Sequence, residues 1–117
     1  MAPTDRHLEV DAGRRAARLG AGPPRGGFRP SASVLFESVA RAWGEAAMGV
    51  ILTGMGRDGV DGLRVLRGAG GRVVAQDEAT SVVFGMPGAA VREGAADYVL
   101  GLPSIARFLA HTVRSDA

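Results

Sequence analysis

The chain has 117 residues, 46% of them hydrophobic, which suits one globular domain with a single core. It contains no cysteine, so disulfides, thiolate metal sites and cysteine nucleophiles are excluded, and its two histidines argue against a histidine-rich metal site. No apolar run approaches the roughly 18 residues of a membrane span. The 14 basic residues are all arginine, and with 12 acidic residues they give a net charge of +2. Because the arginines are spread from Arg6 to Arg114, we expect no nucleic-acid binding. We also expect a cytoplasmic protein that does not insert into a membrane.

Residues 1–30 predict a hairpin followed by a loop. The run His7–Val10 alternates polar and apolar side chains, as a half-buried strand does, and Ala17–Leu19 suits its antiparallel partner across a short turn. Residues 20–27 are rich in glycine and proline and are typical of a loop. No linker divides the chain, so residues 1–117 are interpreted as one unit.

Residues 31–117 alternate helical and extended patterns. Apolar side chains recur at helical spacing after the N-cap candidate Ser31, and again after Pro103. Short apolar runs between the helices are typical of buried parallel strands. The predicted elements are, in order, a helix from 31 that stops at 44, a strand over 48–53, a helix that stops at 68, a strand over 72–75, an extended run over 81–84, a helix from 86 that stops at 94, a strand over 98–100 and a helix from 103.

Strands that alternate with helices predict a parallel sheet with right-handed crossovers. The expected fold class is therefore α/β, a doubly wound and mostly parallel sheet with flanking helices in three layers. In open sheets of this kind, sites form beyond the carboxyl ends of the strands. The most distinctive loop at such a place is Gly54–Gly59, and three interpretations of it compete.

The first interpretation is structural. Asp58 would cap the helix that follows it, because its carboxylate accepts a backbone N–H at the positive helix end. The second is nucleotide binding, because Gly54, Gly56 and Gly59 match the G-x-G-x-x-G pattern between a strand and a helix. Against it, Asp58 places a carboxylate where a pyrophosphate would need the helix N-terminus.

The third interpretation is catalytic. A buried aspartate can orient a histidine and stabilise the imidazolium that forms when this histidine activates a serine. The chain contains no G-x-S-x-G elbow, however. His7 lies in a strand-like run and His111 near the C-terminus, where a lone histidine is usually structural. From local sequence, Asp58 is an acid without an evident base or nucleophile.

Two long motifs carry a resemblance to a known family. They are GVILTGMGRDG over 49–59 and AQDEATSVVFGMP over 75–87. Shorter segments agree with them, namely FRPS, VLF, GAAD and the opening APTDRH, which looks like an A-P-x-D-x-H segment. Over nearly its whole length the chain resembles the chemotaxis protein-glutamate methylesterases of the CheB type.

The resemblance implies a domain that hydrolyses glutamate methyl esters on chemoreceptors and deamidates particular receptor glutamines. It implies a serine nucleophile, a histidine base and an aspartate, without metal or cofactor, and the methylated cytoplasmic helices of receptors as partners. The family's aspartate belongs to the G-M-G-x-D-G loop, so Asp58 is the expected catalytic residue. Met55 and Gly56 of that loop are expected to line the site, with the Met55 backbone N–H directed at the oxyanion.

The chain also departs from the family pattern. The family's serine lies in a G-x-S-T-G turn and its histidine in a Q-H-M-P segment, both before the region matched here, and neither segment occurs in this chain. His7 matches a family histidine outside the triad, and the receiver domain of many members is absent. The chain thus resembles the C-terminal half of the catalytic domain. A truncated reading frame, a relic and one part of a split enzyme are all open.

This departure has consequences for activity and stability. With two of three triad groups missing, we expect no methylesterase activity from the chain alone. The strand over 48–53 would lose cover at residues 50–52, and an exposed strand edge invites pairing. We therefore expect marginal stability, self-association or a partner chain that carries the missing half. A nucleotide-binding module and a non-catalytic interaction domain stay open as alternatives.

Overall fold

The computed structural model describes residues 5–13, 16–54 and 56–115, with residues 113–115 described by their backbone alone. The helices and strands alternate as the sequence predicts, except that the strand predicted over 48–53 ends at Ile51. In the run over 81–84, predicted only as extended, Phe84 makes an isolated bridge to Gly54. The elements are β1 (His7–Asp11), β2 (Ala16–Gly20), α1 (Ala32–Trp43), a 3-10 turn (Gly44–Ala46), β3 (Met48–Ile51), α2 (Val60–Gly68), β4 (Arg72–Gln76), α3 (Met86–Arg92), β5 (Tyr98–Leu100) and α4 (Leu102–Ser115).

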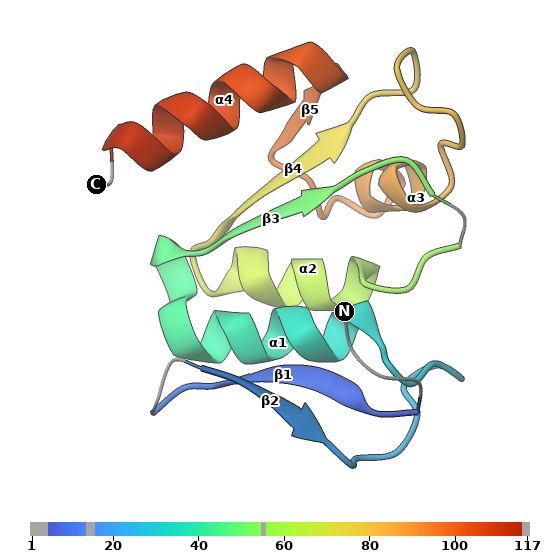
Figure 1. Cartoon of the computed structure of the whole chain (residues 1–117). Coiled ribbons are helices and arrows are strands. Elements are labelled where there is room, and N and C mark those ends of the chain that lie inside the picture. The colour runs from blue at the N-terminus through green and yellow to red at the C-terminus, as the bar shows by residue number, and fades with distance from the viewer. Residues whose placement is uncertain (1–4, 14–15, 55, 116–117) are drawn as a thin grey trace.

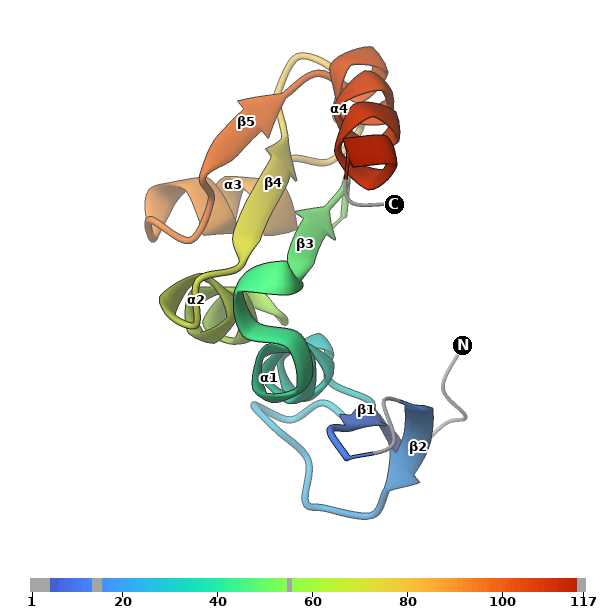
Figure 2. The same ribbon diagram turned by 90° about the vertical axis from the view of Figure 1, so that its left-hand side faces the viewer.

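The parallel strands lie in the order β3-β4-β5, with β4 at the centre. The helices α2 and α3 lie on one face of this sheet and α4 lies on the other (Figures 1 and 2). This arrangement confirms the predicted α/β class with helices on both faces of a parallel sheet. Among the described residues, no helix is both long enough and apolar enough to cross a membrane.

The main core lies between the sheet and α2. Val73 and Ala75 of β4 and Leu63 and Leu66 of α2 are at most 1% exposed, and Ile51 of β3 joins them. Burying one such aliphatic side chain stabilises the fold by about 1.5–3 kcal/mol. These residues hold β3 and α2 together, and so they fix the two ends of the loop that connects them.

The opposite face of the sheet is less completely covered. Ile105 of α4 is buried, and the rings of Tyr98 and Phe108 lie 5.0 Å apart between β5 and α4. At the outer strand the cover is thinner, because Val50 is only half-buried and Leu52, just after β3, is 46% exposed. This exposure agrees with the expected loss of cover at Val50 and Leu52, whereas Ile51, for which the same loss was expected, is buried at 4% exposure because it packs in the core on the α2 side.

The predicted hairpin is present and packs on α1 rather than on the sheet. The strands β1 and β2 pair antiparallel, with His7 opposite Gly20. The backbone N–H of Val10 donates to Ser38 Oγ of α1 at 2.9 Å, and α1 in turn packs against α2. Figure 2 shows the hairpin below α1, with the parallel sheet above. The packing brings His7 to the beginning of α1.

Candidate active site

Asp58 lies in the loop between β3 and α2, beyond the carboxyl end of β3. Its Oδ1 accepts a hydrogen bond from the Ser31 hydroxyl at 2.8 Å, and its Oδ2 accepts one from the Ala32 backbone N–H at 2.8 Å. The carboxylate is therefore held at the N-terminus of α1, where the helix dipole favours a negative charge. The structural interpretation, in which Asp58 caps the helix that follows it, was wrong about the helix. Asp58 accepts the Ala32 N–H at the start of α1, and the N-cap residue of α2 is Gly59.

The local sequence allows this close approach of the loop to α1. Gly59 has φ +101°, a conformation that side chains with a Cβ rarely adopt. A Cβ on Gly59 would also lie 3.1 Å from both Ala32 Cβ and Phe36 Cε2. Glycine after Asp58 thus lets the loop turn against α1 and present the carboxylate to the helix end.

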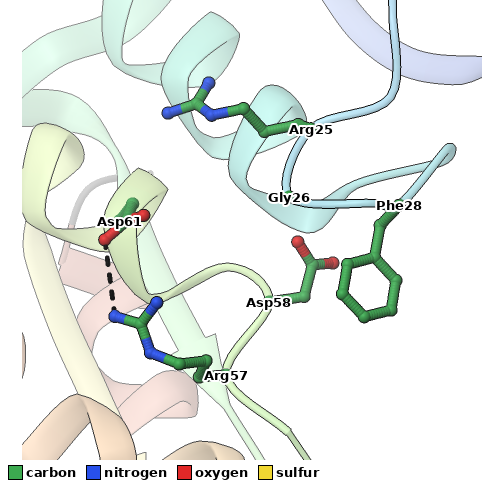
Figure 3. A pocket seen from close by; sticks show the side chains of 6 residues that line it. All are labelled: Arg25, Gly26, Phe28, Arg57, Asp58 and Asp61. Carbon is green, nitrogen blue, oxygen red and sulfur yellow. Dashed lines mark ion pairs between the residues drawn. The ribbon is translucent and has the colours of Figure 1, made fainter.

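A pocket of about 160 Å³ opens beside the Asp58 carboxylate (Figure 3). A carboxylate offers about four lone-pair sites, and the two hydrogen bonds from α1 leave the others for a further donor. Asp58 is half-buried, so it is neither sealed in the core nor turned into bulk solvent. The pocket is lined by Arg25, Gly26, Phe28, Arg57, Asp58 and Asp61.

The walls of this pocket are held by ion pairs. Arg25 lies 2.6 Å from Glu37 of α1, and its backbone pairs with Phe28 in a tight turn that leaves the Phe28 ring 52% exposed. Arg57 donates to both carboxylate oxygens of Glu93, the shorter contact being 2.6 Å, and lies 3.6 Å from Asp61. The guanidinium groups are thus turned toward carboxylates rather than left free beside Asp58.

The Arg57–Glu93 pair changes the titration of both groups. The hydrogen bond from Arg57 lowers the pKa of Glu93 below its ordinary value of 4.5, and the positive charge of Arg57 lowers it further against the opposing effect of burial. The same hydrogen bond and the negative charge of Glu93 raise the pKa of Arg57. At neutral pH the pair is therefore fully charged.

We expect Glu93→Gln to lower stability at neutral pH but not in acid. Because the folded-state pKa of Glu93 is lowered, its contribution is present above about pH 4.5 and is lost as the pH falls through the lowered value. Urea midpoints of the two proteins should differ at pH 7 and converge as the pH falls below the lowered pKa of Glu93. Glu78→Gln, the same change at an exposed glutamate, should show no such gap. Equal effects of the two changes would contradict the role of the pair.

The other predicted site residues fall in different places. Met55 lies outside the described residues. Gly56 is exposed on the same loop as Asp58, with φ +84°. His7 is buried in β1, and His111 is exposed on α4, across the sheet from α2. Within the described part of the chain, no three His, Cys, Asp or Glu side chains form a group that would hold a metal ion.

The glycine pattern of the loop does not leave the start of α2 open for a phosphate. The backbone N–H groups of Gly59 and Gly62 both donate to Ser33 Oγ at 3.1 Å, and the Val60 N–H donates to the Arg57 carbonyl at 3.2 Å. A pyrophosphate at a helix N-terminus needs such amides free. The geometry therefore favours the acidic side chain over the G-x-G-x-x-G pattern as the functional feature of the loop.

A second, wider hollow does not compete as a catalytic site. It measures about 380 Å³ and is lined by Arg64, Arg67, Gly68 and Gly94. Arg67 there is engaged with Asp97 at 2.7 Å and with the Gly94 carbonyl. None of these lining residues is a nucleophile or a general base, so we place the candidate site at Asp58.

Sequence reasoning missed the partners of Asp58. Ser31 was identified as the N-cap candidate of α1, yet its side chain makes no cap bond to its own helix and donates to Asp58 instead. The signal was present in the FRPS segment that carried part of the resemblance. The sequence did not show that this segment contacts Asp58, which lies 27 residues further along the chain.

Asp58 thus lies beyond the carboxyl end of a parallel strand and beside an open pocket, which is where doubly wound α/β domains usually place their sites. Comparison with known families and structures identifies this domain. Residues 1–109 match the CheB methylesterase family. The crystal structure of the Thermotoga maritima CheB methylesterase catalytic domain superposes with a TM-score of 0.87 at 36% identity, over 95% of this chain and 60% of that domain. The chain belongs to the CheB methylesterase family.

Curated relatives agree with this assignment. Protein-glutamate methylesterase/protein-glutamine glutaminase 4 of Myxococcus xanthus is 53% identical over 114 residues. Protein-glutamate methylesterase/protein-glutamine glutaminase 3 of Anaeromyxobacter dehalogenans is 57% identical over the same length. Each alignment covers 97% of this chain, which spans about a third of the length of these relatives.

Proposed function

We propose that this chain supplies the acid of a Ser-His-Asp protein-glutamate methylesterase, and that Asp58 is this acid. The observation that carries the proposal is the half-buried carboxylate, fixed by Ser31 and Ala32 beside an open pocket at the carboxyl edge of the sheet. A triad aspartate has to be immobile and has to keep acceptor capacity for an imidazole N–H. Asp58 meets both conditions.

In the proposed reaction, a histidine donates its Nδ1–H to Asp58 and takes the proton of a serine hydroxyl through its Nε2. The serine oxygen attacks the carbonyl carbon of a glutamate methyl ester, and the histidine returns the proton to the leaving methoxide, which departs as methanol. Water then hydrolyses the acyl-serine by the same proton transfers, which leaves a glutamate carboxylate and the free enzyme. Backbone N–H groups at Met55 and Gly56 would face the oxyanion, and no metal or cofactor takes part.

The serine and the histidine would come from another segment of polypeptide. In the family they lie in G-x-S-T-G and Q-H-M-P segments, which this sequence does not contain. On this proposal residues 1–117 are inactive by themselves and act together with the segment of polypeptide that carries these two motifs. The proposed substrates are methylated glutamates, and particular glutamines, on the cytoplasmic helices of chemoreceptors. The two residue types are those on which the relatives act, as protein-glutamate methylesterases and protein-glutamine glutaminases.

The outer edge of β3 supports the need for such a segment. Within the described residues, β3 pairs with β4 on one side only. Val50 is half-buried and Leu52 is 46% exposed, so neighbouring structure would bury apolar surface there. Self-association through this edge is the competing outcome, and it predicts a dimer without activity.

The test is reconstitution. The chain is mixed with a polypeptide that carries the family's G-x-S-T-G and Q-H-M-P segments, and methanol release from a methylated chemoreceptor is followed. We expect release from the mixture and none from either component alone. Binding of the two polypeptides without methanol release would favour a non-catalytic interaction domain, and activity of the chain alone would contradict the assignment of the missing groups.

A further inference from the structure

A line of buried hydrogen bonds connects the N-terminal hairpin with Asp58. His7 and Ser31 are each only 2% exposed. The Ser31 hydroxyl donates to Asp58 Oδ1 at 2.8 Å, and the Ser31 backbone N–H donates to His7 Nδ1 at 3.2 Å. We propose that His7 and Ser31 are positioning residues that hold the Asp58 carboxylate in one orientation. The proposal rests on the function proposed for Asp58 and adds two residues to it.

The ring of His7 is held in one tautomer by its two partners. Its Nε2 lies 2.8 Å from the Pro23 carbonyl oxygen, which can only accept a hydrogen bond, so Nε2 carries the proton. Its Nδ1 faces the Ser31 N–H, which can only donate, so Nδ1 is unprotonated. The ring therefore connects the loop at Pro23 to Ser31, the N-cap residue of α1.

The Ser31 side chain does not cap its own helix but binds Asp58. A serine at an N-cap normally turns its oxygen toward the N–H groups of its own helix. Ser31 has the extended backbone of an N-cap, with φ −116° and ψ 132°, yet its side chain makes no cap bond. Its single hydroxyl proton goes to Asp58, and the Asp58 carboxylate takes over the cap through the Ala32 N–H.

The backbone of the Asp58 loop does not by itself explain a fixed carboxylate. Gly56 and Gly59 flank the segment with positive φ, so the chain there is intrinsically permissive. Two donors from the rigid end of α1 meet the two carboxylate oxygens separately, and this pair of contacts defines both side-chain torsions. His7 acts indirectly, because it accepts the backbone N–H of Ser31, whose hydroxyl donates to Asp58.

The orientation of Asp58 is tested by nuclear magnetic resonance on the whole chain. In the unsubstituted protein we expect Hα–Hβ couplings of Asp58 that report one χ1 rotamer, and a protected Ala32 amide. In Ser31→Ala and His7→Leu the couplings should become averaged, and exchange of the Ala32 amide should accelerate by about tenfold relative to the Val74 amide in the central strand. His7→Asn, which keeps an acceptor near the position of Nδ1, should restore the single rotamer in part.

Ser38→Ala is the matched control. Ser38 is a fully buried serine of the same helix, and its hydroxyl binds the hairpin at Val10 and the Leu35 carbonyl rather than Asp58. It should lower stability without averaging the Asp58 couplings. A single Asp58 rotamer in both Ser31→Ala and His7→Leu would overturn the proposal, as would equal averaging in Ser38→Ala.

Kinetics of the reconstituted enzyme separate this proposal from the function on which it rests. Ser31→Ala should lower kcat by about 10- to 100-fold with little change in KM, because a misplaced group costs rate rather than binding. In an Asp58→Asn background the same change should cost no further rate, since both act through one carboxylate. If Asp58→Asn itself leaves the rate unchanged, the proposed function fails; if Asp58→Asn slows the reaction and Ser31→Ala does not, only the positioning role fails.

Discussion

Asp58→Asn is expected to lower kcat of the reconstituted enzyme by about ten-thousand-fold, the loss that the corresponding substitution causes in serine proteases. Asp58 Oδ1 and Oδ2 each face a donor, the Ser31 hydroxyl and the Ala32 N–H. An asparagine has one oxygen for these two donors, so its NH₂ group would confront one of them. The amide would also lack the negative charge that stabilises an imidazolium and selects its tautomer.

Asp61→Asn provides the control for this prediction. Asp61 lines the same pocket and carries the same charge, but it is exposed and lies 3.6 Å from Arg57. Exposed ion pairs of this kind contribute little, so we expect kcat within about twofold of the unsubstituted protein. Similar losses in Asp58→Asn and Asp61→Asn would show that pocket charge, and not one positioned carboxylate, governs the rate.

Gly62→Ala is expected to destabilise the fold strongly. A Cβ on Gly62 would lie 2.6 Å from the Ser33 Cα and carbonyl oxygen and 2.9 Å from Phe36 Cβ. Backbone atoms cannot rotate away, so α1 and α2 would have to separate. Overpacking of this kind costs about 1–3 kcal/mol, which is a large part of the stability of a small domain. A drop of about 1 M in the urea midpoint would record this loss.

Gly68→Ala makes the same change on the same helix where nothing opposes it. Apart from its chain neighbours and the backbone of its own helix, no atom of the described residues lies within 4 Å of the position that its Cβ would take. Alanine loses less backbone entropy on folding than glycine, so we expect unchanged stability or a gain of about 0.5–1 kcal/mol. If Gly62→Ala proved as harmless as Gly68→Ala, the close crossing of α1 and α2 would not be essential to the fold.

Local patterns in the sequence predicted most of the secondary structure. The strand at Tyr98–Leu100 was predicted with the limits it has in the structure, and α1 ends before Gly44, as a glycine after a helix indicates. The extended run predicted over 81–84 makes only an isolated bridge. A strand needs a neighbour, and here the Thr53 hydroxyl supplies hydrogen bonds to Val83 that a strand would otherwise supply.

The candidate site was predicted only in part. The resemblance singled out Asp58, and the described residues give this carboxylate defined donors and a pocket. The resemblance also matched His7 to a family histidine outside the triad, and Ser31 was predicted as an ordinary cap. The interpretation that Asp58 caps α2, the helix that follows it, was wrong. Its carboxylate binds the N-terminus of α1, which lies earlier in the chain.

The order of helices and strands, the lack of cysteine chemistry and the presence of one acid in a glycine-rich turn are properties of the amino-acid sequence, because each depends on residues that are neighbours along the chain. Which donors hold that acid depended on packing. The groups around Asp58 come from residues 26 and 27 positions away, and a further link leads to His7 in a separate hairpin. Only the burial of α1 between the hairpin and α2 brings these groups together, since the patterns that specify each helix carry no information about which ends will meet.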